Sequence, residues 1–129
     1  MREPVWILDE VVESIHSMLL AEHGGGSGIR DKALLKAALA RSKQKFNYDS
    51  DVSIFDLAAA YSFGIAKNHP FIDGNKRTAF TIGTLFLEIN GFKLIATEVD
   101  ATVTFENLAT DILDENGLSL WFEECCIKV

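Results

Sequence analysis

The sequence has 129 residues, of which 48% are hydrophobic and 24% are charged, and its formal net charge is −7. This composition excludes an intrinsically disordered chain, and the length predicts that residues 1–129 form a single compact domain. The acidic balance argues against a direct nucleic-acid binder, and no apolar stretch approaches the roughly 20 residues of a membrane span, so we expect a cytoplasmic protein.

The first predicted helix spans residues 8–22, because its apolar side chains recur at helical spacing. They are Leu8, Val12, Ile15, Leu19 and Leu20. A run of glycine and serine over residues 24–28 ends this helix and is typical of a flexible loop. Asp31 suits the N-cap of a second helix, whose apolar face is formed by Leu34, Leu35, Ala38 and Leu39. Residues 42–50 show no period, and we expect a loop there.

Two further helices flank a short loop in the middle of the chain. Ser53 and Asp56 form a capping box that starts the third helix, which runs to about residue 68. The fourth helix starts at Asn75 and is closed by the Asn-Gly pair at 90–91. The proline at position 70 and the Asp-Gly pair at 73–74 predict the loop between them.

The last part of the chain predicts an extended connector over residues 92–96 and two more helices. Thr97 and Asp100 form a capping box for the fifth helix. We expect its apolar residues to face the core, namely Val99, Val103, Leu108 and Ile112. Ser119 begins a short sixth helix that carries Leu120, Trp121 and Ile127. The predicted fold class is therefore all-α, a single compact bundle of about six helices.

Two neighbouring cysteines, Cys125 and Cys126, lie in this last predicted helix. Adjacent cysteines form a disulfide only with strain, and two thiols cannot complete a zinc site. We therefore interpret them as small apolar residues of the helix.

Basic residues are concentrated in the middle of the chain. Residues 30–77 carry nine lysines and arginines against five acids, whereas both flanking segments are acidic. A basic segment in an acidic protein indicates a local anionic ligand such as a phosphate. A solvated, lysine-rich helix face explains the part from Lys32 to Lys45 equally well, but it does not explain Lys76 and Arg77.

The segment that carries chemistry is residues 69–80, with the sequence His-Pro-Phe-Ile-Asp-Gly-Asn-Lys-Arg-Thr-Ala-Phe. Its loop is followed at once by a helix, whose unpaired N–H groups and positive dipole end attract anions. Gly74 allows the backbone to approach a ligand closely, and Asn75, Lys76 and Arg77 add donors. Two cations in a first helical turn disfavour the helix itself, which indicates that this turn binds an anion.

Three further residues of the loop complete a plausible reaction site. Asp73 supplies the hard oxygen ligand that Mg²⁺ on a polyphosphate requires. His69 is the side chain whose usual pKa suits proton abstraction near neutral pH. Phe71, between them, is expected to turn inward and anchor the loop. Together these residues suit attack by a hydroxyl group on a nucleoside triphosphate. The glycine spacing of a Walker loop or of a protein-kinase loop is absent.

The segment resembles the signature of the Fic superfamily and, within it, of the Doc (death-on-curing) toxins. The Doc version contains Asn-Lys-Arg, as at residues 75–77 here, where AMP-transferring Fic enzymes have Asn-Gly-Arg. Residues 28–41, 66–68 and 86–91 resemble Doc sequences as well, so the likeness covers nearly the whole chain. It implies a Fic-type helical bundle.

The resemblance also implies a role for each residue of the motif. His69 matches the general base, Asp73 the Mg²⁺ ligand and Phe71 the aromatic anchor of the loop. The residues expected to bind the nucleotide phosphates are Gly74, Asn75, Lys76 and Arg77, and we expect Lys76 and Arg77 to act with His69 in catalysis.

Doc toxins use ATP and Mg²⁺ to phosphorylate a threonine hydroxyl of elongation factor Tu, which stops translation. The resemblance therefore implies a protein Ser/Thr kinase, inhibited by a small antitoxin whose C-terminal segment folds into a groove on the toxin. Two alternatives stay open: a Fic-type AMP (nucleotide) transferase acting on a protein hydroxyl, and a catalytically silent module that binds a partner. Lys76 in place of glycine disfavours the first, because its side chain occupies space that the α-phosphate needs.

Four residues outside the motif need an interpretation. We interpret His16 and His23 as structural. Arg30 is expected either to pair with an acidic face or to reach the nucleotide. Residues 102–107 match the inhibitory pattern Ser/Thr-x-x-x-Glu-Gly/Asn of many Fic enzymes, but they lie within the fifth helix, so we interpret Glu106 as a solvent-facing helix residue.

Overall fold

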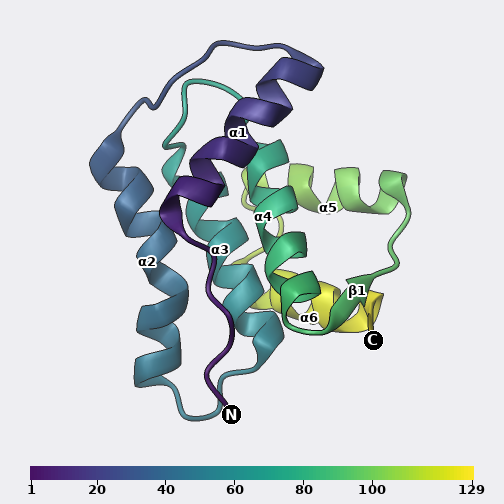
Figure 1. The fold of residues 1–129 in the computed structure, drawn as a ribbon. Helices are drawn as coiled ribbons and strands as arrows, with labels where there is room; N and C mark the ends of the chain where they lie inside the picture. The colour runs from purple at the N-terminus through teal and green to yellow at the C-terminus, as the bar shows by residue number, and fades with distance from the viewer.

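The computed structural model describes residues 1–129 and contains six helices and one small antiparallel sheet (Figure 1). In chain order the elements are α1 (Asp9–His23), α2 (Lys32–Tyr48), α3 (Ile54–Asn68), α4 (Asn75–Ile89), β1 (Phe92–Leu94), α5 (Glu98–Ala109), α6 (Glu115–Cys125) and β2 (Cys126–Lys128). The predicted all-α class is confirmed. None of the helices has the length and apolar character needed to cross a membrane.

Helix α3 lies at the centre of the fold, with α2, α4 and α6 packed around it (Figure 1). Nine of its 15 residues are buried, among them the three alanines at 58–60. Small side chains let neighbouring helices approach closely, as the sequence predicts. The 21 residues of the apolar core form one cluster around this helix. This packing holds the end of α3 and the start of α4 in fixed positions.

Local capping signals are confirmed at three helix starts. Asp31 accepts a hydrogen bond from the Leu34 N–H at 3.0 Å. Ser53 and Asp56 form the reciprocal capping box of α3. Thr97 accepts from the N–H of residue 100 at the start of α5, but the predicted capping box is only half formed there, because the Asp100 carboxylate accepts from Trp121 Nε1 at 3.1 Å instead. Each of the capping bonds joins residues three positions apart, so the sequence alone contains the whole motif.

Two helix boundaries differ from the prediction. Residues 42–48, expected as a loop, continue α2, because Ser42 donates a hydrogen bond to the Leu57 carbonyl at 2.6 Å and Phe46 packs edge-on against Trp6 at 5.6 Å. Helix α6 begins at Glu115 rather than at Ser119, because Asp114 accepts from the N–H of residue 117. Tertiary contacts thus extend α2, and the N-cap at Asp114 sets the start of α6 at Glu115.

The buried face of α5 is also different from the predicted one. Val99, Val103 and Ile112 are exposed, and only Leu108 of the expected set is buried. The residues that face the core are Ala101, Thr104, Phe105 and Leu108. Phe105 packs edge-on against Phe80 of α4, with ring centroids 5.3 Å apart. The large aromatic ring thus sets which face turns inward. On α6, Leu118 and Phe122 are buried and Leu120 is exposed.

The small sheet joins two segments far apart in the sequence. The predicted connector at 92–96 contains β1, which pairs antiparallel with β2 so that Leu94 faces Cys126. Ile127 is therefore in a strand and not in the sixth helix. Cys125 ends α6 and Cys126 begins β2, and both are free thiols.

Candidate active site

The loop between α3 and α4 reverses the chain within six residues. His69 is the C-cap of α3 and adopts a left-handed conformation, with φ 48° and ψ 53°. Gly74 is the N-cap of α4 and is left-handed as well, with φ 78° and ψ 18°. The first of these conformations is uncommon for a residue with a side chain, so the surroundings of His69 must hold it in place.

Phe71 fixes the middle of the loop to the core. Its side chain is 1% exposed and stacks on the buried imidazole of His16, with ring centroids 3.7 Å apart. The His16 Nε2 lies 2.8 Å from the Asp73 carbonyl oxygen, within hydrogen-bond distance. Helix α1 therefore supports the loop from beneath, through one ring that contacts two of its residues.

Asn75 connects the loop to the imidazole of His69. Its Oδ1 accepts from the Phe71 N–H at 3.0 Å and its Nδ2 donates to the Phe71 carbonyl at 2.9 Å. These two bonds fix the orientation of the amide, whose Nδ2 also lies 3.3 Å from His69 Nδ1. An amide nitrogen can only donate, so Nδ1 is the acceptor and the proton of the neutral ring is on Nε2.

The first turn of α4 has the features of an anion site. No side chain caps its N-terminus, and the N–H groups of residues 75–77 have no hydrogen-bond partner. Arg77 makes no ion pair, whereas Lys76 contacts Glu106 of α5 at 2.5 Å. Unpaired amides, the helix dipole and a free guanidinium all favour a negatively charged group at this point.

Asp73 is the acid of the loop. Its Oδ1 accepts from the Gly74 N–H at 2.9 Å and its Oδ2 from the Gly26 N–H at 3.3 Å, which leaves lone pairs on both oxygens. No group of three His, Cys, Asp or Glu side chains could hold a metal alone. Mg²⁺ in phosphate-transfer sites is commonly held by one or two carboxylates and the substrate phosphates, and a single exposed carboxylate beside a phosphate site fits that pattern.

These residues share a pocket of about 810 Å³ that lies between the loop, the start of α4, and α5. It is lined on one side by His69, by Asp73 and by the four residues that follow. The opposite side is partly apolar, with Phe80, Ala101 and Phe105. The sequence did not indicate this second side, because it forms only when α5 packs on α4. A pocket of this size suits a nucleotide.

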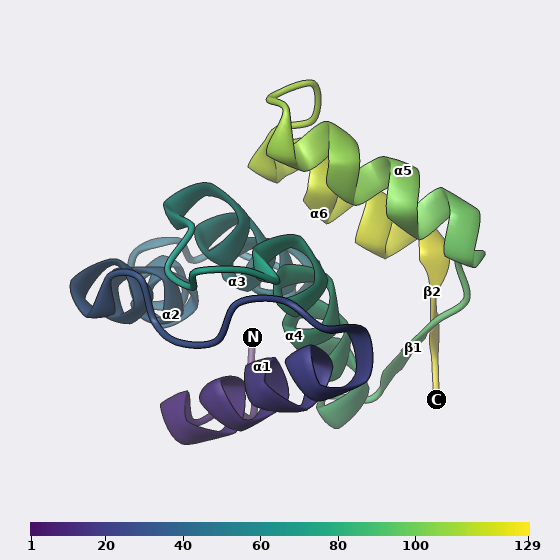
Figure 2. The ribbon, with the colours of Figure 1, turned by 90° about the horizontal axis from the view of Figure 1, so that it is seen from above.

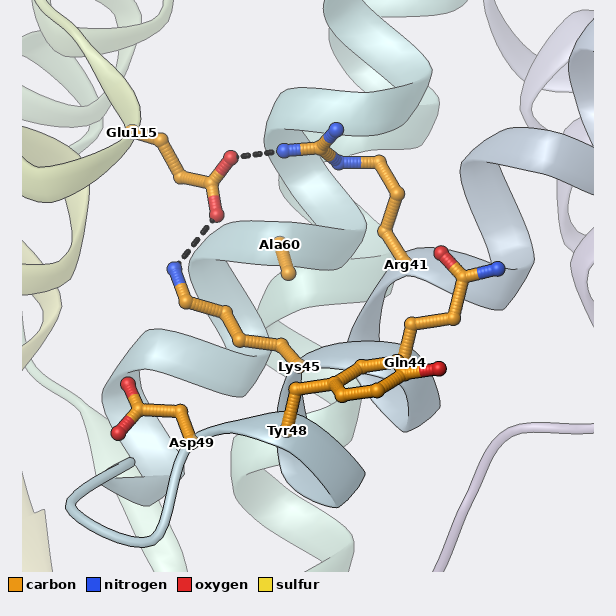
Figure 3. A pocket seen from close by; sticks show the side chains of 7 residues that line it. All are labelled: Arg41, Gln44, Lys45, Tyr48, Asp49, Ala60 and Glu115. Carbon is orange, nitrogen blue, oxygen red and sulfur yellow. Dashed lines mark hydrogen bonds and ion pairs between the residues drawn. The ribbon is translucent and has the colours of Figure 1, made fainter.

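A second hollow, of about 390 Å³, lies between α2 and α6 (Figure 3). Both of its cations, Arg41 and Lys45, bind the carboxylate of Glu115, the latter at 2.8 Å. Because that carboxylate engages both cations and Asp49 adds a second negative charge to the lining, this hollow offers no comparable anion site. We interpret the three side chains as a tie between two helices.

The remaining sequence candidates have contacts that the sequence did not reveal. Glu106 is 54% exposed, as expected of a solvent-facing residue, but its carboxylate reaches Lys76 across the pocket. Arg30 pairs with no acid and does not line the pocket. Its guanidinium instead donates to the main-chain carbonyls of residues 68 and 69. His23 is exposed at the rim of the pocket.

Comparisons with known proteins identify a family for the chain. The model of the Fic/DOC family matches residues 6–87. The chain is similar to Toxin Doc of Mycolicibacterium smegmatis, with 43% identity over 74 residues, which is 57% of either chain. It is also similar to Protein kinase doc of Escherichia phage P1, with 31% identity over 88 residues, which is 68% of this chain and 70% of that one.

Proposed function

The chain belongs to the Fic/Doc family, and from this premise we propose that it is the toxin of a toxin–antitoxin pair that acts in the cytoplasm as a protein kinase. The kinase would transfer the γ-phosphoryl group of ATP, with Mg²⁺, to a serine or threonine hydroxyl of a protein, and we propose elongation factor Tu as that protein. One observation carries the proposal: His69, Asp73 and the unpaired first turn of α4 line the same pocket.

The start of α4 would hold the phosphates. The three free N–H groups at 75–77 are fixed donors, and fixed donors stabilise the charge that develops on a transferring phosphoryl group; the Arg77 guanidinium would add a positive charge beside them. Lys76 would contribute once its ammonium exchanges the Glu106 carboxylate for a phosphate oxygen. The low cost of that exchange follows from the exposure of both partners, which are 47% and 54% exposed.

His69 would take the proton of the target hydroxyl. As the hydroxyl oxygen attacks the γ-phosphorus, the bond between this phosphorus and the bridging oxygen to the β-phosphate breaks, ADP leaves and the proton passes to the imidazole. In the resting ring, the Nδ1 lone pair faces the Asn75 amide at 3.3 Å. The imidazolium that forms carries a proton on both nitrogens and can accept no hydrogen bond. Its formation therefore requires the 3.3 Å contact between Asn75 Nδ2 and His69 Nδ1 to be released.

Asp73 would hold Mg²⁺ together with the phosphates. A bound Mg²⁺ neutralises phosphate charge and orients the polyphosphate. The hydrogen bonds from the N–H groups of Gly26 and Gly74 orient the carboxylate toward this task.

A paired labelling assay tests the proposed reaction. The protein and elongation factor Tu are incubated with Mg²⁺ and either γ-³²P-ATP or α-³²P-ATP, with His69→Ala as the control. We expect label from the γ position only, and none with His69→Ala. Label retained from the α position would instead establish nucleotide transfer. Absence of label from both would contradict the proposed target and favour a silent binding module.

The antitoxin is the second proposed partner, with its C-terminal segment bound in a groove of this chain. Co-expression tests it. Expression of the toxin alone is expected to arrest growth, and the antitoxin encoded beside it is expected to restore growth and to co-purify with the chain. Growth arrest that no neighbouring gene relieves would contradict the pairing.

A further inference from the structure

We propose that Arg30 is a positioning residue for His69. The guanidinium fixes the main chain at the end of α3, from which the imidazole enters the pocket. Arg30 Nε donates to the His69 carbonyl at 2.7 Å, and its Nη2 donates to the Asn68 carbonyl at 2.8 Å. Figure 2 shows the segment before α2 running alongside the loop between α3 and α4, which brings two parts of the chain 39 positions apart into contact.

The main chain of the same segment extends this contact to a third carbonyl. The N–H groups of Arg30 and Asp31 both donate to the Pro70 carbonyl, at 2.7 and 3.1 Å. Three consecutive carbonyls, those of residues 68–70, are therefore held by the chain at 30–31. A left-handed conformation at a residue with a side chain persists only where the surroundings determine it, and His69 lies in the middle of these three carbonyls.

The chemistry of the contact favours an arginine over a lysine. The last carbonyls of a helix lack partners within the helix and carry its negative dipole end. A guanidinium presents several N–H donors in a rigid plane and stays charged at any pH at which the protein is folded. It can thus bridge two carbonyls at once, whereas a lysine ammonium acts as a single point. No acidic side chain pairs with Arg30, so the carbonyls are its partners.

The imidazole depends on this support because little else holds it. His69 is exposed, and the one side-chain hydrogen-bond partner of its ring is Asn75, whose Nδ2 lies 3.3 Å from His69 Nδ1. The direction in which the ring enters the pocket therefore follows from the backbone at residues 68–70. A small displacement of a general base costs much of its catalytic effect.

Substitution at position 30 tests the proposal, which uses the proposed function for its kinetic readout. Arg30→Ala is expected to lower kcat by about ten- to a hundredfold while KM for ATP and Tm stay near wild type. Arg30→Lys is expected to be intermediate, and methylguanidinium is expected to restore part of the activity of Arg30→Ala. Lys32→Ala is the matched control, because this exposed cation two positions away has no partner, and it should behave as wild type.

Two kinetic results would overturn the proposal. An unchanged kcat in Arg30→Ala shows that His69 does not need the contact, and a raised KM for ATP with unchanged kcat makes Arg30 a nucleotide ligand. A second readout is independent of phosphate transfer. The NMR signals of the His69 ring should shift or broaden in Arg30→Ala and not in Lys32→Ala. If the wild type labels no target, the proposed function fails, but the His69 ring signals still test the role of Arg30. Ring signals in Arg30→Ala that are unchanged from wild type would overturn that role.

Discussion

His69 and Asp73 lie on an exposed loop, so their side chains can be removed without disturbing the core. We expect His69→Ala to reduce phosphate transfer at least about a hundredfold, the lower range for loss of general base catalysis, and Asp73→Ala to reduce it as well, because it removes the carboxylate that would hold Mg²⁺. Their free energies of unfolding should change by no more than about 0.5 kcal/mol, as at other surface positions. Labelling assays and urea unfolding measure the two effects. Full activity in both variants would refute the site.

The contact between Lys76 and Glu106 competes with the proposed use of Lys76. The Glu106 carboxylate forms an ion pair with the Lys76 ammonium, with Oε1 and Nζ 2.5 Å apart. Glu106→Gln should therefore free Lys76 for phosphate and lower KM for ATP about two- to fivefold, which corresponds to the free energy of an exposed ion pair. The control is Glu123→Gln, an exposed acid of α6 without an ion pair. A higher KM in Glu106→Gln would mean that the carboxylate assists nucleotide binding.

For single residues, the sequence predicted which candidate site residues lie together only where they are close in the chain. His69, Asp73 and Asn75 lie within seven positions, and the loop and capping signals around them suffice to bring them together. The contacts of Arg30 with residue 69 and of Glu106 with Lys76 span 39 and 30 positions. No local pattern carries that information, because it depends on how α2 and α5 pack.

Among the elements, α3 and α6 are joined through one carboxylate. Asp56 caps α3 and also accepts a hydrogen bond from Ser119 of α6 at 2.6 Å. Burial by itself would raise the pKa of Asp56, but the hydrogen bonds from Ser119 and Ser53 outweigh it and keep the pKa below its usual value of 3.8. The ionised carboxylate is therefore the form that the contact between the two helices stabilises.

The sign of the pH dependence follows from that lowered pKa. The contribution of Asp56 to stability is complete above pH 3.8 and is lost as the pH falls through the lower pKa of the folded state. Ser119→Ala should cost about 1.5–3 kcal/mol at pH 7, the value of a hydrogen bond to a charged group, and less at acidic pH. Urea unfolding of Ser119→Ala and wild type at pH 7 and at a pH below 3.8 measures the two losses in the free energy of unfolding. The exposed Ser17→Ala is the control, and an equal loss at both pH values would exclude a role for ionised Asp56.

The helix boundaries and faces were predictable only where one local signal dominated. The caps at Asp31 and Ser53 are such signals. On α5, two alternative faces both carry apolar residues, and the face with Phe105 is buried because that ring packs on Phe80. The continuation of α2 past residue 42 likewise depends on distant parts of the chain, namely Leu57 of α3 and Trp6 of the segment before α1.

Over the whole molecule, four of the nine cations in the basic middle of the sequence pair with acids that follow it. Arg41 and Lys45 bind Glu115, Lys67 binds Asp111, and Lys76 binds Glu106. These four cations thus attach the C-terminal part of the chain to the rest of the fold. Of the two cations in the first turn of α4, Arg77 is the one without an ion pair, and it lines the pocket. The net charge of the segment was a weaker indication of the site than this one residue.

Three helices meet at Gly83, which has no room for a side chain. A Cβ there would lie 2.1 Å from Ser62 Oγ on α3 and 3.0 Å from the Phe122 ring on α6. Ser62 cannot move away easily, because its hydroxyl donates to the Ala79 carbonyl at 2.6 Å. Gly83→Ala gains up to about 1 kcal/mol of helix propensity. Overpacking a core costs about 1–3 kcal/mol, so we expect net destabilisation.

A second helical glycine provides the comparison. At Gly117 of α6, a Cβ would meet the end of the flexible Leu113 side chain, at 2.6 Å, and the Asp114 carboxylate at 3.1 Å. The leucine can shift, so Gly117→Ala should be neutral or slightly stabilising. Urea unfolding of both variants measures the difference. If Gly83→Ala proved as stable as Gly117→Ala, the close approach of α3, α4 and α6 would not be a constraint on the fold, and the fixed placement of the α4 N-terminus beside His69 would need another cause.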